Sequence, residues 1–248
     1  MKNKKVAIIT GASLGIGKAI ALKLNKEGLI TVLVSRNQKN LNNALKDFSD
    51  KAIAIKADVS KEKEVILMVK KVIKKFGRVD ILINNAAFLM FKKIEQITRT
   101  DFNKMIGTNI GGVFYCMREC VKQMKKQSKG GQIINIGSLV SKTPFLFPTR
   151  SLYCSTKSAI NAFANSIQAE MQIEKNNIKI ATIHPGLIFT ESSINKNAFN
   201  YKDLSKYALK IKDIAYIIQM IINQGKNSNI TEVVISPIAR IRNKKFLK

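Results

Sequence analysis

The sequence predicts an α/β protein built on a doubly wound parallel β-sheet, and two observations carry this prediction. Seven short runs consist almost continuously of Val, Ile, Leu and Ala, which is typical of strands buried on both faces of a parallel sheet. Segments with helical periodicity and lysines on their outer face lie between these runs. Strict alternation of the two indicates right-handed β–α–β crossovers. The strands are expected at 5–10, 30–35, 51–56, 79–84, 132–137, 179–184 and 231–236, and the helices at 15–27, 39–47, 61–76, 100–126, 152–175 and 211–224.

Length and connections favour a single domain over residues 1–248. A chain of 248 residues suits one α/β domain and needs no disulfide or metal to stabilise its core. The sequence contains no linker, internal repeat or low-complexity tract. One long connection, from about 187 to 210, lacks a predicted element. Such a connection in a compact domain usually forms a lid or binding loop, and we expect it to contact the substrate.

The net charge of +27 suggests nucleic-acid binding, but its distribution argues against that function. Lys supplies 36 of the 43 basic residues, and the lysines are spread along the whole chain. Ile is equally abundant, at 36 residues, as A/T-rich codons would produce. The sequence has none of the Arg-rich or aromatic-interleaved patches that nucleic-acid binders carry. We therefore expect no nucleic-acid partner, although the positive field favours anionic ligands.

Cysteine usage and hydropathy predict a cytoplasmic protein with no metal site and no membrane span. Cys116 and Cys120 lie one helical turn apart, but no histidine or further cysteine lies nearby to complete a metal site. We interpret them as free thiols in a reducing compartment. The apolar run after the basic N-terminus has only four residues, too few for a signal peptide. No stretch approaches the roughly 20 apolar residues that a membrane span needs.

A glycine-rich turn after the first strand predicts a dinucleotide site and hence a Rossmann-like fold. The sequence T-G-A-S-L-G-I-G spans residues 10–17, and an amphipathic helix follows at once. Glycines at positions 11, 15 and 17 allow a tight turn and a close approach of backbone N–H groups to a pyrophosphate. The helix N-terminus adds the positive end of its dipole. A glycine triplet alone is weak evidence, but its strand–turn–helix context makes it much stronger.

The end of the second strand predicts NADP(H) as the cofactor. An enzyme that prefers NAD normally carries an acidic residue there, which binds the ribose 2′-hydroxyl. This chain has Ser35 and Arg36, with no acid before Asp47. A guanidinium binds a 2′-phosphate in a bidentate way, and no carboxylate repels the phosphate. The alternative is that Arg36 is a surface residue that stacks on the adenine.

Asp58 and Val59 follow the third strand, at the edge of the sheet where the cofactor is expected. The carboxylate of Asp58 has two possible roles: it accepts a hydrogen bond from the adenine amino group, or it caps the helix that begins near Lys61. Both roles are compatible with its position.

Three residues predict the chemistry of carbonyl reduction, which requires an acid beside the substrate oxygen. Tyr153 and Lys157 lie four residues apart at the start of a helix and therefore share one face. We expect the Lys157 ammonium to lower the pKa of Tyr153 from its usual value near 10 and to bind the nicotinamide ribose. Ser138 follows a strand at the ligand-binding edge, where its hydroxyl is expected to hydrogen-bond the substrate oxygen.

Taken together, these motifs resemble the short-chain dehydrogenase/reductase family over residues 5 to about 236. Asn84-Asn-Ala86, Asn109 and Pro185-Gly186 complete the set, in order and at family spacing. The resemblance implies a catalytic tetrad of Asn109, Ser138, Tyr153 and Lys157, in which Asn109 helps to hold a water that links Lys157 to solvent. It also implies that Asn84 steadies the sheet beneath the adenosine ribose and that Pro185, Gly186, Ile188 and Thr190 border the nicotinamide. The expected cofactor-binding residues are Thr10, Gly11, Ser13, Gly15, Ile16, Gly17, Ser35, Arg36, Asp58, Val59, Asn84, Ala86, Tyr153, Lys157, Pro185, Gly186, Ile188 and Thr190.

Three positions depart from the family pattern or stand outside it. Ala87 replaces the Gly that usually completes the N-N-A-G motif, which we expect to be tolerated. Leu14 stands where many NADP-dependent members carry Arg or Lys, so phosphate recognition depends more on Arg36. The single histidine, His184, occupies a position that the family does not require, and we interpret it as a structural or pocket-lining residue.

The sequence predicts the class of substrate and the type of assembly, but not the individual substrate. Apolar residues at 89–91, 139–140, 144–147 and 188–189 predict a small hydrophobic carbonyl or alcohol as substrate, either free or bound to a carrier. The resemblance suggests a 3-oxoacyl-[acyl-carrier-protein] reductase, whereas the C-terminal T-E-V-V-I-S-P at 231–237 is more similar to the endings of 3-hydroxy acid dehydrogenases. Other carbonyl reductases and a non-catalytic dinucleotide sensor are alternatives, although sensors usually lose the Tyr or the Lys. Family members assemble as homodimers or homotetramers through two long helices, here 100–126 and 152–175.

Overall fold

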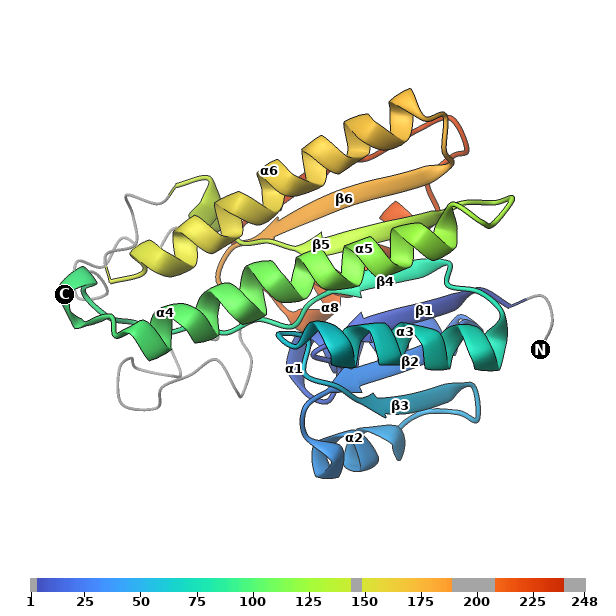
Figure 1. Ribbon diagram of the computed structural model, residues 1–248, viewed down its shortest axis with the longest axis horizontal. Coiled ribbons are helices and arrows are strands. Elements are labelled where there is room, and N and C mark those ends of the chain that lie inside the picture. The colour runs from blue at the N-terminus through green and yellow to red at the C-terminus, as the bar shows by residue number, and fades with distance from the viewer. Residues whose placement is uncertain (1–3, 144–148, 189–207, 239–248) are drawn as a thin grey trace.

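The structure is a computed structural model that describes residues 4–143, 149–188 and 208–238. Within these residues seven strands form one parallel sheet in the order β3-β2-β1-β4-β5-β6-β7 (Figure 1). The order reverses between β1 and β4, so the ends of these two strands open a crevice at the carboxyl edge of the sheet. The predicted doubly wound α/β class is therefore confirmed.

The strands agree with the predicted apolar runs to within about two residues. Strands β1, β2 and β4 are buried along nearly their whole length, as a continuous apolar run requires in a sheet covered on both faces. The bounds are Val6–Thr10 (β1), Ile30–Ser35 (β2), Ala52–Lys56 (β3), Ile81–Asn84 (β4), Gly131–Ile136 (β5), Ile178–Pro185 (β6) and Glu232–Ile235 (β7).

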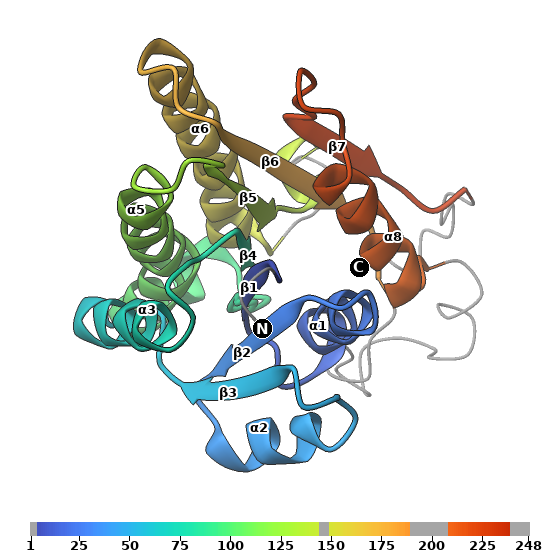
Figure 2. The ribbon, with the colours of Figure 1, turned by 90° about the vertical axis from the view of Figure 1, so that its right-hand side faces the viewer.

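Helices cover both faces of the sheet, as Figure 2 shows. One hydrophobic core lies beneath α3, α5 and α6, and a second lies beneath α1, α2 and α8. Each helix buries an apolar stripe, the arrangement that the helical periodicity predicts, and the lysines lie on the outer face except for Lys157 of α6, which is buried. The bounds are Gly15–Lys26 (α1), Gln38–Leu45 (α2), Glu62–Phe76 (α3), Arg99–Ile106 (α4), Gly112–Met124 (α5), Ser151–Ile173 (α6) and Ile211–Ile222 (α8).

The helix predicted over 100–126 is divided in the structure, and this prediction was wrong in detail. A π-helical turn, Gly107–Gly111, separates α4 from α5 while the rod stays continuous (Figure 1). The break coincides with Asn109, whose side chain is bound to residues of other segments. Short 3₁₀ turns at Ile94–Gln96 and Leu139–Ser141 were also not predicted. A π-turn within a helix, such as the one at Gly107–Gly111, often marks a functional position.

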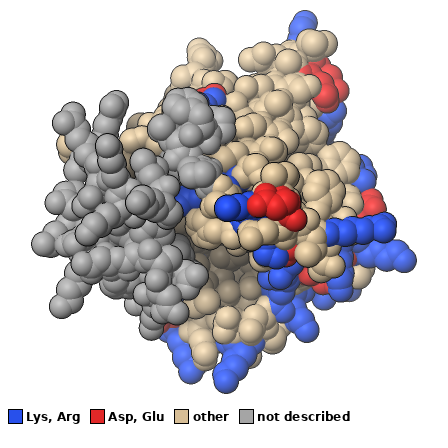
Figure 3. Space-filling view, turned by 90° about the vertical axis from the view of Figure 1, so that its left-hand side faces the viewer, with Lys and Arg blue, Asp and Glu red and all other residues tan. Residues whose placement is uncertain are grey.

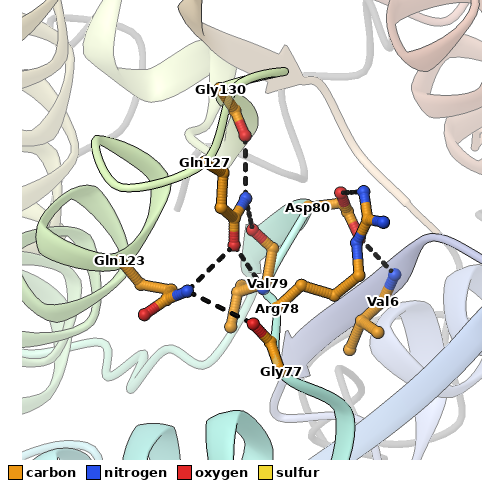
Figure 4. Close-up of polar contacts among 8 residues, drawn as sticks. All are labelled: Val6, Gly77, Arg78, Val79, Asp80, Gln123, Gln127 and Gly130. Carbon is orange, nitrogen blue, oxygen red and sulfur yellow. Dashed lines mark hydrogen bonds and ion pairs between the residues drawn. The ribbon is translucent and has the colours of Figure 1, made fainter. Parts of the chain in front are cut away.

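Structural contacts close the opposite, amino-terminal edge of the sheet (Figure 4). The Gln127 carboxamide accepts a hydrogen bond from the N–H of Val79 and donates one to the carbonyl of the same residue, both at 2.9 Å. The Asp80 carboxylate accepts from the N–H of Val6 at 2.8 Å and from two nitrogens of Arg78 at 2.8 and 2.5 Å. These side chains satisfy backbone groups that the strands leave unpaired at this edge.

Two further observations concern the cysteines and the hydropathy. Cys116, Cys120 and Cys154 are buried free thiols, and burial raises the pKa of the Cys116 thiol to about 12. Among the described helices none combines the length and the apolar character that crossing a membrane requires.

Candidate functional site

The predicted site residues gather at the carboxyl edge of the sheet. Figure 3 shows this end of the molecule, which is hollowed beside the residues drawn in grey, with Lys and Arg gathered toward one side. Thr190 and much of the expected substrate loop, residues 189–207, lie outside the described residues, as do residues 144–147 of the expected pocket wall. The rest of the predicted set is described.

The glycine-rich turn forms a cradle between β1 and α1. Gly11 has a φ of +64°, and a Cβ there would lie 2.9 Å from the Cα of Ala86. A Cβ at Gly17 would lie 2.5 Å from the carbonyl oxygen of Gly11, so the turn passes close to the helix. The helix begins at Gly15, and its N-cap residue, Leu14, makes no side-chain cap. Its first backbone N–H groups and the positive dipole end therefore face the crevice, which suits a pyrophosphate.

Asn85, which the sequence analysis did not single out, holds this cradle in place. Its amide nitrogen donates to the carbonyls of Thr10 and Gly11, at 3.0 and 3.2 Å. The Thr10 hydroxyl in turn accepts hydrogen bonds from the N–H groups of Asn85 and Ala86, at 3.0 and 3.1 Å. The second Asn of the N-N-A motif was the available sequence signal, and its role depends on a contact between segments 75 residues apart.

Asn84 lies in the interior of the sheet. Its side chain is 4% exposed and donates to the Asn135 carboxamide on the neighbouring strand at 2.9 Å. Asn84 and Asn135 are register partners of β4 and β5, so this bond ties the two strands at the crevice.

The end of β2 presents the residues expected near the adenosine ribose. The Ser13 hydroxyl donates to that of Ser35 at 3.0 Å, which links the glycine turn to β2. Arg36 follows and is exposed. Within the described part of the chain its guanidinium forms no ion pair, so its donors remain available to a phosphate.

The structure assigns Asp58 a local role in the turn after β3. Its carboxylate accepts hydrogen bonds from the backbone N–H and the hydroxyl of Ser60, at 3.0 and 2.7 Å. Lys61, and not Asp58, is the N-cap residue of α3, so the predicted capping role of the Asp58 side chain was wrong. The next residue, Val59, is buried, and it packs so closely on α5 that a Cβ at Gly112 would lie 2.7 Å from it.

Lys157 and Ser138 meet at the end of β5. Lys157 is 3% exposed, and its ammonium donates to the carbonyl of Ile136 at 2.7 Å. Burial lowers the pKa of Lys157 to about 8. Ser138 begins the short turn after this strand, and its hydroxyl accepts from the N–H of Val140 at 3.4 Å.

Tyr153 differs from the expectation in the direction of its pKa. Burial raises the pKa of its hydroxyl to about 12, against the opposing effects of a hydrogen bond with Ser138 and of the Arg150 charge. The Lys157 ammonium lies 5.7 Å from the centre of the tyrosine ring and is itself bound to a backbone carbonyl. The predicted lowering of the Tyr153 pKa by Lys157 is therefore not found, because desolvation outweighs the nearby charges.

Asn109 joins three segments beneath the site. Its side-chain oxygen accepts from the N–H of Phe88 at 2.7 Å, and its nitrogen donates to the Phe88 carbonyl at 2.9 Å and to the Thr156 hydroxyl at 3.1 Å. Thr156 donates to the carbonyl of Tyr153 at 2.8 Å. Asn109 is fully buried, so it connects the loop after β4, the π-turn and the first turns of α6.

The end of β6 forms the remaining wall. Gly186 donates to the carbonyl of Ile235 at 2.7 Å, and a Cβ on it would lie 2.9 Å from Pro237. Ile188 pairs with Leu209 in an isolated bridge, which brings the two ends of the expected substrate loop together. Pro185 ends the strand beside fully buried His184.

Comparison with known proteins shows which proteins this chain resembles. The family described as short chain dehydrogenase matches residues 5–200. An uncharacterized oxidoreductase of Staphylococcus epidermidis is 33% identical over 235 residues, covering 95% of this chain and 98% of that protein. An alcohol dehydrogenase from the archaeon Thermococcus sibiricus, complexed with 5-hydroxy-NADP, has a TM-score of 0.82 and 28% identity, covering 97% of this chain and 100% of that one. A 3-ketoacyl-(acyl-carrier-protein) reductase from Brucella melitensis, complexed with NADH, has a TM-score of 0.84 and 26% identity, covering 94% of this chain and 96% of that one. This chain belongs to the short-chain dehydrogenase/reductase family of oxidoreductases.

Proposed function

We propose that this chain is an NADP(H)-dependent enzyme that reduces a carbonyl group, or oxidises the corresponding alcohol, by hydride transfer. The observation that carries the proposal is the meeting of Ser138, Tyr153 and Lys157 beside the glycine cradle, at one edge of the sheet. A dinucleotide sensor would need the cradle alone, whereas this chain keeps a complete acid site next to it.

The roles of the three residues follow from their surroundings. When bound, NADPH supplies the hydride. Ser138 donates a hydrogen bond to the substrate oxygen, which holds the carbonyl beside the acid and stabilises the charge that develops on that oxygen. Tyr153 gives its proton to the same oxygen. With its pKa raised, the hydroxyl is protonated at neutral pH and therefore has the proton to give. Lys157 holds the ribose hydroxyls and keeps a positive charge beneath the site.

Arg36 supports the choice of NADP(H) over NAD(H). The related structures were obtained with either type of cofactor, so the preference of this chain depends on its own residues. Arg36 is exposed at the end of β2, and the first acidic residue after it is Asp47, which forms an ion pair with Lys18. We expect the guanidinium to bind the 2′-phosphate, with Ser13 and Ser35 beside the ribose.

The Arg36→Glu variant tests this assignment. We expect the KM for NADPH to rise about 10- to 100-fold and the KM for NADH to change little, because one charge-assisted pair is lost and a carboxylate is placed beside the phosphate. The control is Lys39→Glu, which makes the same change of charge three residues further on, in α2. Equal effects of the two substitutions would contradict a specific role for Arg36 and would indicate only the general positive field.

The first substrate candidate is a 3-oxoacyl thioester, either free or bound to an acyl carrier. The exposed apolar residues Leu89 and Phe91 beside the site, together with the basic surface, support an acyl chain with an acidic carrier. Turnover on 3-oxoacyl thioesters, 3-oxo acids and neutral ketones, followed by loss of NADPH absorbance, tests the proposed function. Turnover of any class supports a reductase, whereas cofactor binding without turnover on all of them would favour the sensor.

Arg150 favours the second candidate, a 3-hydroxy acid dehydrogenase. This residue precedes α6, and its guanidinium stacks 4.6 Å from the centre of the Phe91 ring. Its charge opposes the rise in the pKa of Tyr153 that burial causes. Because the Arg150 charge acts on the Tyr153 hydroxyl, it would also attract a substrate carboxylate next to the reacting carbon.

Replacing Arg150 separates the two substrate classes. We expect Arg150→Leu to raise the KM for a 3-oxo acid about tenfold, the loss of one charge-assisted contact, and to leave the KM for a neutral ketone unchanged. Arg150→Lys, which keeps the charge, should lie between the variant and the wild type. An equal loss on acid and ketone would exclude carboxylate recognition by Arg150.

We also infer assembly as a homodimer or homotetramer through α5 and α6. Phe114 on α5 and Ile173 at the end of α6 are exposed, with 38% and 82% of their surfaces accessible. Phe114 lies against Phe163 of α6, with ring centres 5.8 Å apart, so the two helices present a joint apolar surface.

A further inference from the structure

We propose that His184 is a positioning residue that holds Ser138 in place through the hydroxyl of Ser141. This inference rests on the proposed function, in which Ser138 binds the substrate oxygen. It adds to that function a residue on β6 that acts through the turn after β5.

One nitrogen of the His184 ring faces the Ser138 turn. Nδ1 lies 2.8 Å from the Ser141 hydroxyl and 3.3 Å from the carbonyl oxygen of Ser138. The Ser141 hydroxyl donates to the same Ser138 carbonyl at 2.7 Å. The ring is fully buried, and a Cβ at Gly137, the residue before Ser138, would lie 2.8 Å from Nδ1. The turn therefore rests directly on the imidazole.

The other ring nitrogen is anchored away from the site. Nε2 lies 3.2 Å from the side-chain oxygen of Asn161 on α6 and 3.4 Å from the carboxylate of Glu232 on β7. Glu232 also forms an ion pair with Lys142, which follows the Ser138 turn. Both neighbours of Nε2 are acceptors, so this nitrogen carries a hydrogen and donates it. The ring is thus fixed on this side by Asn161 and Glu232, two side chains that the proposed function does not use.

This anchoring assigns a specific role to the Ser141 hydroxyl. It has a single hydrogen to donate, and two acceptors compete for it: the Ser138 carbonyl and, in the neutral ring, Nδ1. The position of the ring therefore decides how the Ser138 carbonyl is held. Because that carbonyl belongs to the backbone of Ser138, a shift of this peptide unit would move the Ser138 backbone, and with it the hydroxyl that bonds with Tyr153. A displacement of about 1 Å at such a group costs on the order of 100-fold in rate.

Two amide substitutions separate positioning from simple loss of packing. Asn at 184 places an amide near the position of Nδ1, whereas Gln places it near Nε2. We expect His184→Asn to keep kcat close to the wild type and His184→Gln to lower kcat about 10- to 100-fold, with the KM for NADPH unchanged in both. Ser141→Ala should resemble His184→Gln, and combining these two should cost less than the product of their separate effects. Thermal unfolding of each variant shows how far a loss of kcat follows a loss of stability.

A second readout is independent of turnover. His184 is the only histidine, so its ring nitrogens give a single pair of NMR resonances in the intact protein. We expect Ser141→Ala to shift the Nδ1 resonance and to leave Nε2 unchanged. Wild-type kcat in the Gln variant, equal losses in the Asn and Gln variants, or an Nδ1 resonance indifferent to Ser141→Ala would each overturn the proposal. Ser138→Ala is measured alongside: if it turns over like the wild type, the proposed function fails, and the NMR shift alone then decides the contact between His184 and Ser141.

Discussion

The Tyr153→Phe variant should lose turnover by about 10²- to 10⁴-fold, the range that a positioned general acid contributes. The substitution removes one oxygen atom and keeps the ring, so packing around the buried position changes little. Tyr153 hydrogen-bonds the Ser138 hydroxyl, whereas the Lys157 ammonium is bound to the carbonyl of Ile136, so we do not expect Lys157 to replace the tyrosine proton. The measurement is kcat with NADPH and the best substrate, together with the NADPH dissociation constant, which we expect to change far less.

Tyr216→Phe is the matched control. Tyr216 lies on α8, is exposed, and stacks with Lys23 away from the site. Its substitution should leave kcat at the wild-type value. Turnover in Tyr153→Phe comparable to this control would show that another group, or solvent, supplies the proton.

Replacing Lys157 should remove activity and also change the pH dependence of stability. Burial lowers the pKa of Lys157 from 10.5 to about 8, so the folded state binds this proton less well than the unfolded state. Above pH 10.5 both states are neutral and the effect is absent. As the pH falls to 8 the unfolded state gains the proton alone, which destabilises the fold by about 3 kcal/mol, and the penalty is constant at lower pH. Lys157→Met removes the penalty.

We therefore expect Lys157→Met to lose most of its turnover. Its stability at or below pH 8 should nevertheless gain from removal of the penalty. The free energy of unfolding of the variant relative to the wild type should decline by about 3 kcal/mol between pH 8 and pH 10.5. Denaturant unfolding at both pH values measures this difference, with Lys70→Met on the exposed side of α3 as control. A pH-independent difference would mean that Lys157 titrates normally in the folded protein.

The sheet could be predicted from sequence because its signal is local. An uninterrupted apolar run such as Val-Leu-Val in β2 predicts a strand buried on both faces without knowledge of its neighbours. The glycines at 11 and 17 predict a tight turn, in which a Cβ at either position would clash. The family spacing of Ser138, Tyr153 and Lys157 similarly predicted that these residues share one site, and in the structure they lie near the end of β5.

What could not be predicted depends on contacts between distant segments. The π-turn at Asn109 follows from its bonds to Phe88 and Thr156, which lie 21 and 47 residues away. The role of Asn85 and the surroundings of His184 depend in the same way on the packing of several elements. The direction of the Tyr153 pKa shift was mispredicted because sequence spacing shows that a cation is near but not how deeply the hydroxyl is buried.

The most direct test of the central claim is a titration of the purified protein with NADPH and, separately, with NADH, followed by nicotinamide fluorescence. We expect saturable binding of both cofactors, with NADPH bound at least about tenfold more tightly, the value of one charge-assisted contact to the 2′-phosphate. Tighter binding of NADH would contradict the assignment of Arg36, and failure of both to bind would contradict the dinucleotide site itself.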